Sequence, residues 1–213
     1  MDLRRIVDLA GASLCLLLVS PILPLVAAAI WLTDRETVFH RQARTGLNGR
    51  TFTVLKFRSM RINNLPLDHP TEIRHGHPLV TPIGSLIRRF KIDELPQIFN
   101  VLRGEMSLIG PRPALPEQVV EYTPYQRRRL EIRPGLTGWA QISGGIEISW
   151  PDRILLDVWY VDHRSLWIDA LIVLSTFSVI FGGERSNPRR LAQATAYAAS
   201  REEALRIPQL SRA

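Results

Sequence analysis

The residues of this chain best suited to chemistry are two neighbouring carboxylates, Asp93 and Glu94, in the segment Lys-Ile-Asp-Glu-Leu-Pro-Gln that occupies positions 91–97. Arg88, Arg89 and Lys91 lie just before them. Cations and a helix N-terminus at this point would keep both acids ionised and would also attract phosphate. Taken alone, the same pattern also fits an ordinary helix cap, in which Asp93 has no catalytic role.

Two short helices are predicted on either side of this pair. The downstream helix has an apolar stripe at i, i+3, i+4 and i+7 and ends at a glycine; its residues are Leu95, Ile98, Phe99, Leu102 and Gly104. Asp93 stands where its N-cap belongs, and Pro96 is acceptable in a first turn. The upstream helix should begin at Thr81-Pro82.

A β-hairpin is predicted ahead of these helices. Residues 37–44 and 50–57 have the composition of strands, and Asn48-Gly49 between them favours a tight turn. The second strand leads into Lys56 and Arg58, which alone could be a solvated sheet edge. Only beside the family resemblance described below do we interpret these two cations as partners of the carboxylates or of a phosphate.

Two further arginines stand beside prolines. Arg112 lies between Pro111 and Pro113, and Arg133 precedes Pro134. Proline restricts the backbone on both of its sides, so each guanidinium is predicted to have a stiff mount, suited to bidentate binding of phosphate. A purely structural arginine is the alternative.

The C-terminal half is predicted to be helical. We expect one helix from Pro116 to Ile132, with Arg127–Arg129 on a solvated face, and another that begins at Ser149 and carries Asp157. A third, apolar helix should run from Ser165 to Phe181; an interfacial membrane helix suits it better than a core helix. The segment 183–213 has no interpretable role, and His75-Gly76-His77 is interpreted as part of a surface loop rather than a metal site.

The N-terminal region favours membrane insertion. Residues 12–32 form an apolar run that would reach roughly 31 Å as a helix, long enough to cross a bilayer, although a buried soluble helix is the alternative. Pro21 and Pro24 should break this helix, and Ser20 offers a hydroxyl to a freed carbonyl. Arginines on both flanks favour two cytoplasmic ends, and hence a re-entrant helix over a straight span.

Composition is consistent with an anionic partner. The 213 residues carry a net charge of +7 with a pI near 10.4, which suits lipid headgroups, nucleotide phosphates or nucleic acid. The single cysteine, Cys15, can form no disulfide within the chain. A non-enzymatic basic module is therefore a rival interpretation, disfavoured by the apolar N-terminus and the lack of a DNA-binding motif.

Several long motifs in order extend this interpretation. After the Asp93-Glu94 segment come Asn-Val-Leu-Arg-Gly-Glu-Met-Ser-Leu-Ile-Gly-Pro-Arg-Pro at 100–113 and Arg-Pro-Gly-Leu-Thr-Gly-Trp-Ala-Gln at 133–141. From about Arg4 to Phe181 the chain closely resembles the bacterial sugar transferase family, the monotopic phosphoglycosyl transferases. In the loop before Thr81 it departs from the family pattern, which leaves contacts specific to the sugar open there.

The resemblance implies an enzyme that moves a sugar phosphate from a UDP-sugar to polyprenyl (undecaprenyl) phosphate and releases UMP. It implies that Asp93 is the nucleophile, which carries a covalent phosphosugar, and that Glu94 holds Mg²⁺. It further implies that four cations stabilise phosphate charge: Lys56, Arg58, Arg112 and Arg133. An aspartate at position 157 also belongs to the pattern, with a role that the sequence does not assign.

Taken together, the predicted fold is α+β and predominantly α-helical. It combines a re-entrant membrane helix (1–33), a catalytic domain with a small β-hairpin and interfacial amphipathic helices (34–182), and a tail (183–213). We expect the active site on the cytoplasmic face of the bacterial inner membrane, with membrane lipids but not nucleic acid as partners. The sugar, the pathway and the oligomeric state stay open, a homodimer among the options.

Overall fold

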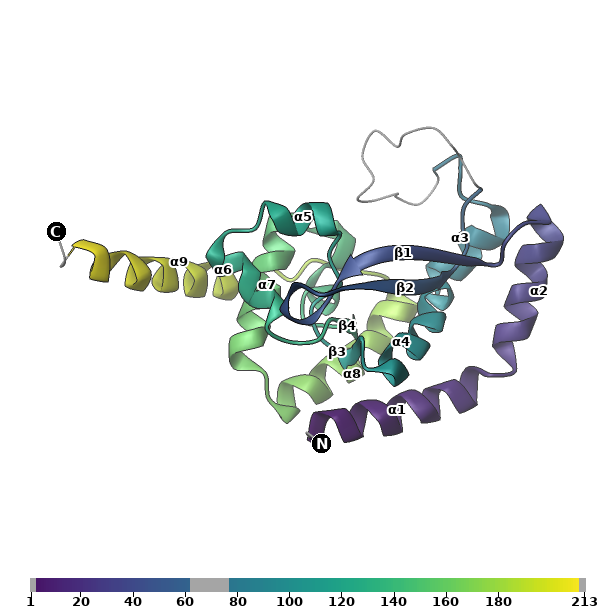
Figure 1. Cartoon of the computed structure of the whole chain (residues 1–213), viewed down its shortest axis with the longest axis horizontal. Coiled ribbons are helices and arrows are strands. Elements are labelled where there is room, and N and C mark those ends of the chain that lie inside the picture. Colours follow the sequence, from purple (N-terminus) through teal and green to yellow (C-terminus); the bar gives the residue numbers. More distant parts are fainter. Residues whose placement is uncertain (1–2, 62–76, 211–213) are drawn as a thin grey trace. The chain divides into compact units, whose positions relative to one another are not determined.

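The computed structural model describes residues 3–61 and 77–210, which are mostly helical, as predicted (Figure 1). The chain divides into two compact units. The first contains Met1–Ala43 and Phe52–Leu108, and the second contains Arg44–Thr51 and Ile109–Ala213. The predicted hairpin is present, with its body in the first unit and its tip in the second.

The first unit contains the N-terminal helices and the segment with the carboxylate pair. Its elements are α1 (Leu3–Val19), α2 (Ile22–Asp34), most of β1 (Phe39–Thr45) and β2 (Thr51–Phe57), α3 (Pro82–Arg89), the 3₁₀ helix η2 (Ile92–Gln97) and α4 (Ile98–Arg103). A small core joins α2 to α3 and β2 through Ile30, Phe57 and Ile87, each at most 2% exposed. The turn predicted at Asn48-Gly49 is present and takes the form of a 3₁₀ turn, η1 (Leu47–Gly49), between the strands.

The N-terminal apolar run bends near its middle. Among the described residues, no single helix has both the length and the apolarity to cross a bilayer; α1 and α2 together have both, but they are bent by 60°. Ser20 Oγ donates to the Leu17 carbonyl at 2.9 Å, at the predicted break. Pro21 precedes α2, and Pro24 lies in its first turn, where a missing N–H costs no helical hydrogen bond.

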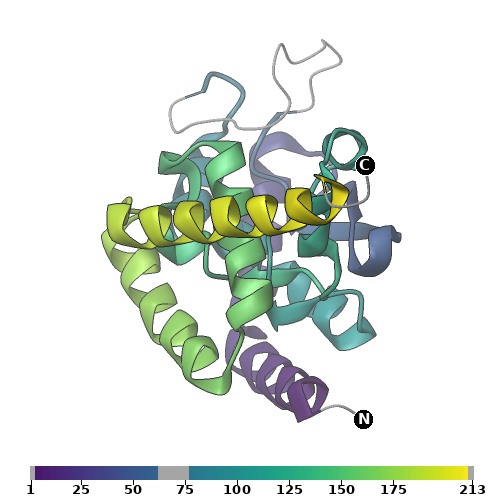
Figure 2. The same cartoon turned by 90° about the vertical axis from the view of Figure 1, so that its left-hand side faces the viewer.

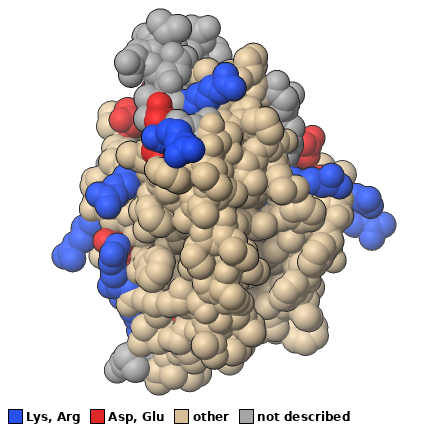
Figure 3. Space-filling model, turned by 90° about the vertical axis from the view of Figure 1, so that its right-hand side faces the viewer, with Lys and Arg blue, Asp and Glu red and all other residues tan. Residues whose placement is uncertain are grey.

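Both helices expose apolar side chains. In α1 these include Leu14, Leu17 and Leu18, and in α2 Leu25 and Leu32, each at least 59% exposed. Figure 3 looks at the side of the molecule that carries α2 and shows a wide surface without Lys, Arg, Asp or Glu among the described residues. An apolar surface of this extent is typical of a contact with membrane or protein.

Polar contacts tie α1 to the α4 region. Arg5 donates to the carbonyls of Val101 (2.6 Å) and Leu102 (2.9 Å), in the last turn of α4. Asp8, 6% exposed, accepts from Ser107 Oγ (2.8 Å) and from the Leu108 amide (2.9 Å). We call these four hydrogen bonds the α1 clamp. They satisfy C-terminal carbonyls of α4 and give a charged residue of an apolar helix its partners.

The second unit is built around helix α7 (Trp150–His163). Its other elements are β4 (Gly135–Thr137), α5 (Pro116–Val120), α6 (Pro124–Arg127), the 3₁₀ helices η3 (Arg128–Leu130), η4 (Gln141–Ser143) and η5 (Gly145–Glu147), α8 (Leu166–Gly182) and α9 (Pro188–Leu210). β4 forms a two-stranded sheet with β3 (Ser107–Ile109). Ser149 and Ser165 cap α7 and α8, and Gly183 ends α8, all as predicted.

The predicted continuous helix over 116–132 is wrong. The chain leaves the helix after Val120, and Thr123 begins a new one with a capping box, in which Thr123 and Gln126 bond each other's main-chain amides. Pro124 follows at the first helical position, where proline is favoured. Local capping therefore divides the segment into α5, α6 and η3.

The C-terminal segment is part of the core of this unit. Helix α9 lies across α7 in Figure 2, with Ala194 and Ala198 buried against α7 residues such as Leu156 and Val158. Helix α8 buries Ile172 completely but leaves Leu166, Trp167, Leu174, Phe177 and Phe181 at least 58% exposed. It therefore combines a core contact with an apolar surface.

Candidate functional site

The carboxylate pair lies at a sharp reversal between α3 and η2. Helix α3 begins as predicted, with Thr81 Oγ1 accepting from the Gly84 amide at 2.9 Å. After α3, Lys91 adopts a left-handed conformation (φ 57°), which turns the chain directly into η2. A lysine held in this conformation is strained, and such strain is concentrated at functional sites.

Asp93 and Glu94 occupy the first turn of η2. The prediction that Asp93 caps the helix is wrong: Lys91 is the N-cap of η2, and Gln97 is the N-cap of α4. Gly104 ends α4 as predicted, with φ 84°. Both acids nevertheless lie at the positive end of a helical segment, although a 3₁₀ turn of six residues has a weak dipole.

The structure brings Lys56 to Glu94. Lys56 Nζ lies 2.7 Å from Glu94 Oε1, and the two side chains are 18% and 13% exposed. Charge-assisted contacts of this kind are among the stronger hydrogen bonds. The predicted pairing of a hairpin cation with the carboxylates is thus present for Lys56.

Arg58 forms an ion pair with Glu36. Its Nη1 lies 2.5 Å from Glu36 Oε2, and its side chain is 6% exposed. Glu36 lies between α2 and β1, so this ion pair fixes the end of β2 to the segment that follows the N-terminal helices. The phosphate-binding role of Arg58 stays a prediction.

The carboxylates of Asp93 and Glu94 are donors that suit a hard cation with a preference for oxygen ligands. Glu94 already holds a cationic group at 2.7 Å, and Asp93 supplies a second carboxylate next to it. Within residues 3–61 and 77–210 no cluster of three or more acidic, histidine or cysteine ligands occurs. Mg²⁺ commonly binds through one or two carboxylates and completes its shell with substrate phosphates and water, so this pair fits Mg²⁺ better than a metal that needs a full protein cage.

The second unit brings together the two segments with proline-flanked arginines. The Gly110 amide donates to the Thr137 carbonyl, and the Gly135 amide donates to the Pro111 carbonyl, both at 2.9 Å. A Cβ on Gly135 would lie 2.0 Å from the Gly110 nitrogen, and one on Gly138 2.1 Å from the Gly110 oxygen. Only glycine allows this approach, so the two motifs 110–113 and 133–138 form one backbone unit.

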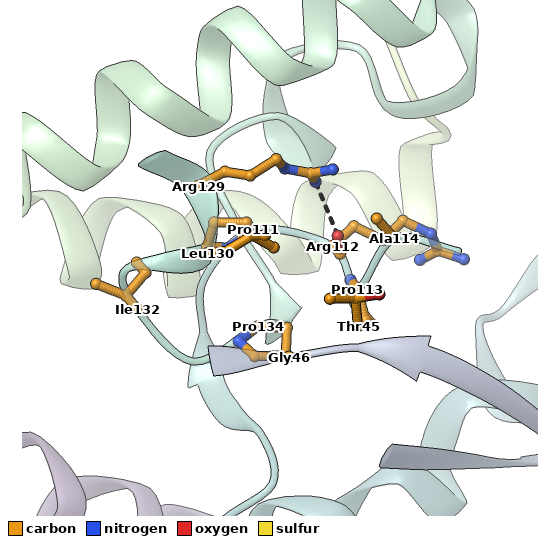
Figure 4. A pocket seen from close by; sticks show the side chains of 10 residues that line it. All are labelled: Thr45, Gly46, Pro111, Arg112, Pro113, Ala114, Arg129, Leu130, Ile132 and Pro134. Carbon is orange, nitrogen blue, oxygen red and sulfur yellow. Dashed lines mark hydrogen bonds between the residues drawn. The ribbon is translucent and has the colours of Figure 1, made fainter. Parts of the chain in front are cut away.

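Arg112 and Arg133 therefore extend from neighbouring strands of chain. A small pocket beside Arg112 is lined by Pro111–Ala114, by Pro134 and by Thr45-Gly46 from the hairpin tip (Figure 4). Thr45 and Ala114 pair as an isolated β-bridge, with the Thr45 amide 2.9 Å from the Ala114 carbonyl. The predicted stiff mount of Arg112 is present, and its phosphate-binding role stays a prediction.

The arginine run 127–129 is only partly the solvated face that we expected. Arg127 is exposed, but Arg128 forms a bidentate ion pair with Asp162, and Arg129 is buried beside Asp157. Asp157 is 1% exposed, and burial raises its pKa to about 6, against the opposing effect of Arg129. The roles of Arg129, Arg5 and Asp8 were not predicted from the sequence, since their partners Asp157, Val101 and Leu108 lie 28 to 100 residues away.

With this geometry in view, the comparison with known families is decisive. The family model described as "Bacterial sugar transferase" matches residues 1–183. The chain belongs to the bacterial sugar transferase family. Membership excludes the non-enzymatic basic module. The matched residues include the N-terminal helices α1 and α2, both arginine loops and α8, while α9 lies beyond them.

Relatives of this sugar transferase cover most of its length. A Bacillus subtilis protein named as an uncharacterized sugar transferase, EpsL, is 42% identical over 186 residues, 86% of this chain and 90% of that protein. The undecaprenyl-phosphate glucose phosphotransferase of Komagataeibacter xylinus is 44% identical over 188 residues, 81% of this chain and 35% of that protein. An Aeromonas hydrophila UDP-N-acetylgalactosamine-undecaprenyl-phosphate N-acetylgalactosaminephosphotransferase is 38% identical over 85% of this chain and 44% of that protein. The chain thus spans less than half the length of the latter two.

Proposed function

We propose that this enzyme, a sugar-phosphate transferase, moves a sugar 1-phosphate from a UDP-sugar to a polyprenyl phosphate, undecaprenyl phosphate in bacteria. The observation that carries the proposal is the Asp93-Glu94 pair beside Lys56, presented by a strained turn in a member of this family. The names of two relatives, which specify undecaprenyl phosphate and in one case a UDP-sugar, support the substrate class. The product would enter the assembly of a bacterial glycoconjugate.

The proposed reaction has two displacements at one phosphorus atom. A carboxylate oxygen of Asp93 attacks the phosphate that carries the sugar; the bond from this phosphorus to the bridging oxygen breaks, and UMP leaves with the electron pair. The sugar phosphate is then an acyl phosphate on Asp93. A phosphate oxygen of the polyprenyl acceptor attacks the same phosphorus, the bond to Asp93 breaks, and the carboxylate is regenerated.

The chain's own charges would serve this chemistry in different ways. Lys56 orients Glu94, and the four cations Lys56, Arg58, Arg112 and Arg133 would neutralise phosphate charge. Glu94 is the residue that would hold Mg²⁺, which when bound would neutralise charge on the phosphate oxygens. Asp93 is the nucleophile in this assignment.

We further propose that α1 and α2 enter and leave the bilayer on the cytoplasmic face. The 60° bend at Ser20-Pro21 and the apolar surfaces of both helices support a re-entrant arrangement. The α1 clamp supports it too, because Arg5 is hydrogen-bonded to helix α4 of the same unit. A straight span would instead place Arg5 on the opposite side of the membrane from α4. The exposed apolar side chains of α8 suit a helix at the interface.

The topology can be tested by cysteine labelling. With Cys15 removed, a cysteine placed near residue 2 should resist a membrane-impermeant reagent in intact cells. Replacement of Pro21 and Pro24 by leucine should straighten the run and expose that cysteine to the reagent. Labelling of the unmutated prolyl form from outside would overturn the re-entrant arrangement.

The activity itself is tested by UMP release. The enzyme is incubated with polyprenyl phosphate, Mg²⁺ and each of a panel of UDP-sugars, and UMP is measured. We expect release with one sugar or a few related ones, and none after Asp93→Asn, because an amide is a far poorer nucleophile. Release of free UDP in place of UMP would show glycosyl transfer and would refute the proposal.

A further inference from the structure

A buried ion pair lies next to the Arg112 loop. Arg129 Nη2 and Asp157 Oδ2 are 2.5 Å apart, and the two side chains are 1% and 2% exposed. Removing two charges from water is costly, and an apolar pair of similar volume is often equally stable. A role beyond stability would account for charges in this position.

Arg129 connects Asp157 to the main chain of the loop. The same Nη2 donates to the Arg112 carbonyl at 2.8 Å, as Figure 4 shows, and Nη1 donates to the Tyr122 hydroxyl at 2.6 Å. The guanidinium also lies over the Trp150 ring, 5.0 Å from its centroid. A planar guanidinium with contacts in several directions has little freedom, so its donation to Arg112 is fixed in direction.

The loop is held at each peptide around Arg112. The carbonyls of four consecutive residues, 111–114, accept from four different donors: Gly135 N (2.9 Å), Arg129 Nη2 (2.8 Å), Arg44 Nη1 (3.1 Å) and Thr45 N (2.9 Å). The donor at Arg112 itself is oriented by the buried carboxylate of Asp157. Rotation of the peptide that follows Arg112 would break this bond.

We infer that Asp157, acting through Arg129, is a positioning residue that sets the backbone of Arg112 and hence the direction of its guanidinium. The inference rests on the proposed function, in which Arg112 binds phosphate. It assigns a role to the aspartate at 157, which the sequence pattern left without one. Neither Asp157 nor Arg129 needs to touch the substrate.

The charge state of Asp157 gives the inference a pH signature. Four groups face it: Arg129 from η3, Arg153 on its own helix, Arg112 from the loop and the Tyr122 hydroxyl beyond Arg129. Burial raises the pKa of Asp157 to about 6, and the arginines oppose this rise. Protonation below that pH would weaken the ion pair and release Arg129.

The first test is a double-mutant cycle on the purified full-length enzyme. Asp157→Asn should raise KM for the UDP-sugar by about tenfold, and it should cause little further loss when Arg112 is already alanine. Asp162→Asn is the matched control: Asp162 pairs with Arg128, on the same two elements, and also accepts from the Tyr197 hydroxyl of α9. If the effects of Asp157→Asn and Arg112→Ala on KM are fully additive in the double variant, the inference is overturned.

The second test does not depend on turnover. Hydrogen exchange in peptides that cover residues 109–114 should be faster in Asp157→Asn than in the unmutated enzyme, and unchanged in Asp162→Asn. Activity of the unmutated enzyme should fall as the pH drops through about 6, a limb that Asp157→Asn should lack. Unchanged hydrogen exchange in the loop of Asp157→Asn would overturn the inference. If the unmutated enzyme releases no UMP, the proposed function is refuted, and the exchange result alone then decides whether Asp157 positions the loop.

Discussion

The α1 clamp makes a stability prediction that can be worked out from its contacts. Asp8→Ala removes the acceptor of two donors, Ser107 Oγ and the Leu108 amide, at a site where Asp8 is 6% exposed. Loss of a hydrogen bond to a carboxylate costs about 1–3 kcal/mol, so the loss of two costs about 2–6 kcal/mol. The better helix propensity of alanine offsets roughly 0.5 kcal/mol of this.

We therefore expect the midpoint of thermal unfolding to fall by about 5–15 °C, since 1 kcal/mol corresponds to roughly 2–4 °C in a chain of this size. The assay is a melt of the detergent-purified enzyme. Ser13→Ala is the control, because Ser13 is an exposed residue of the same helix and is likewise replaced by alanine. Asp8→Asn should lose less, because its amide oxygen can still accept one bond.

A double-mutant cycle isolates the clamp from any change in membrane insertion. Asp8→Ala and Ser107→Ala should be less than additive, because both changes remove the same Ser107–Asp8 hydrogen bond. If Asp8→Ala unfolds at the same temperature as Ser13→Ala, the clamp does not stabilise the fold and our reasoning is wrong.

Three other predictions test the second unit and the carboxylate pair. Gly135→Ala should cut turnover about a hundredfold, because its Cβ would force the two arginine loops apart. Gly182→Ala is the control and should keep full turnover, since its Cβ would meet nothing within 4 Å. Equal turnover of the two variants would show that the close approach of segments 110–113 and 133–138 is not needed for activity. Lys56→Met should lower the Mg²⁺ concentration needed for half-maximal turnover, because Lys56 competes with Mg²⁺ for the Glu94 carboxylate. An unchanged Mg²⁺ titration would show that Lys56 does not compete with the metal ion. Because burial raises the pKa of Asp157 from 3.8 to about 6, the free energy of unfolding of the unmutated enzyme should fall by about 3 kcal/mol relative to that of Asp157→Asn as the pH rises across that window; two unfolding free energies that keep a constant difference would contradict the raised pKa.

Features set by neighbouring residues were predictable from the sequence. The starts of α3, α7 and α8 at Thr81, Ser149 and Ser165, and the end of α4 at Gly104, follow from side chains that bond amides three residues away or from a glycine with positive φ. The break at Ser20-Pro21 is equally local. These signals act within one turn, so no tertiary partner is needed to interpret them.

Other features depend on competition or on distant partners. The capping box at Thr123 overrode the apolar periodicity of 116–132, and the left-handed Lys91 moved the helix start ahead of Asp93. The burial of Arg129 requires Asp157 on another helix, and the α1 clamp joins residues about 100 positions apart. Arginine in a basic run is usually solvated, so only the fold distinguishes Arg129 from its neighbours.

The covalent loading of Asp93 is the most direct test of the proposed chemistry. Enzyme is given Mg²⁺ and a UDP-sugar labelled in the sugar, without polyprenyl phosphate, and the protein is separated and digested. We predict about one equivalent of UMP released per active enzyme, label retained in the peptide that contains Asp93, and loss of that label when polyprenyl phosphate is added. Label on Asp93→Asn, or lipid product formed while the unmutated protein never carries label, would contradict the account.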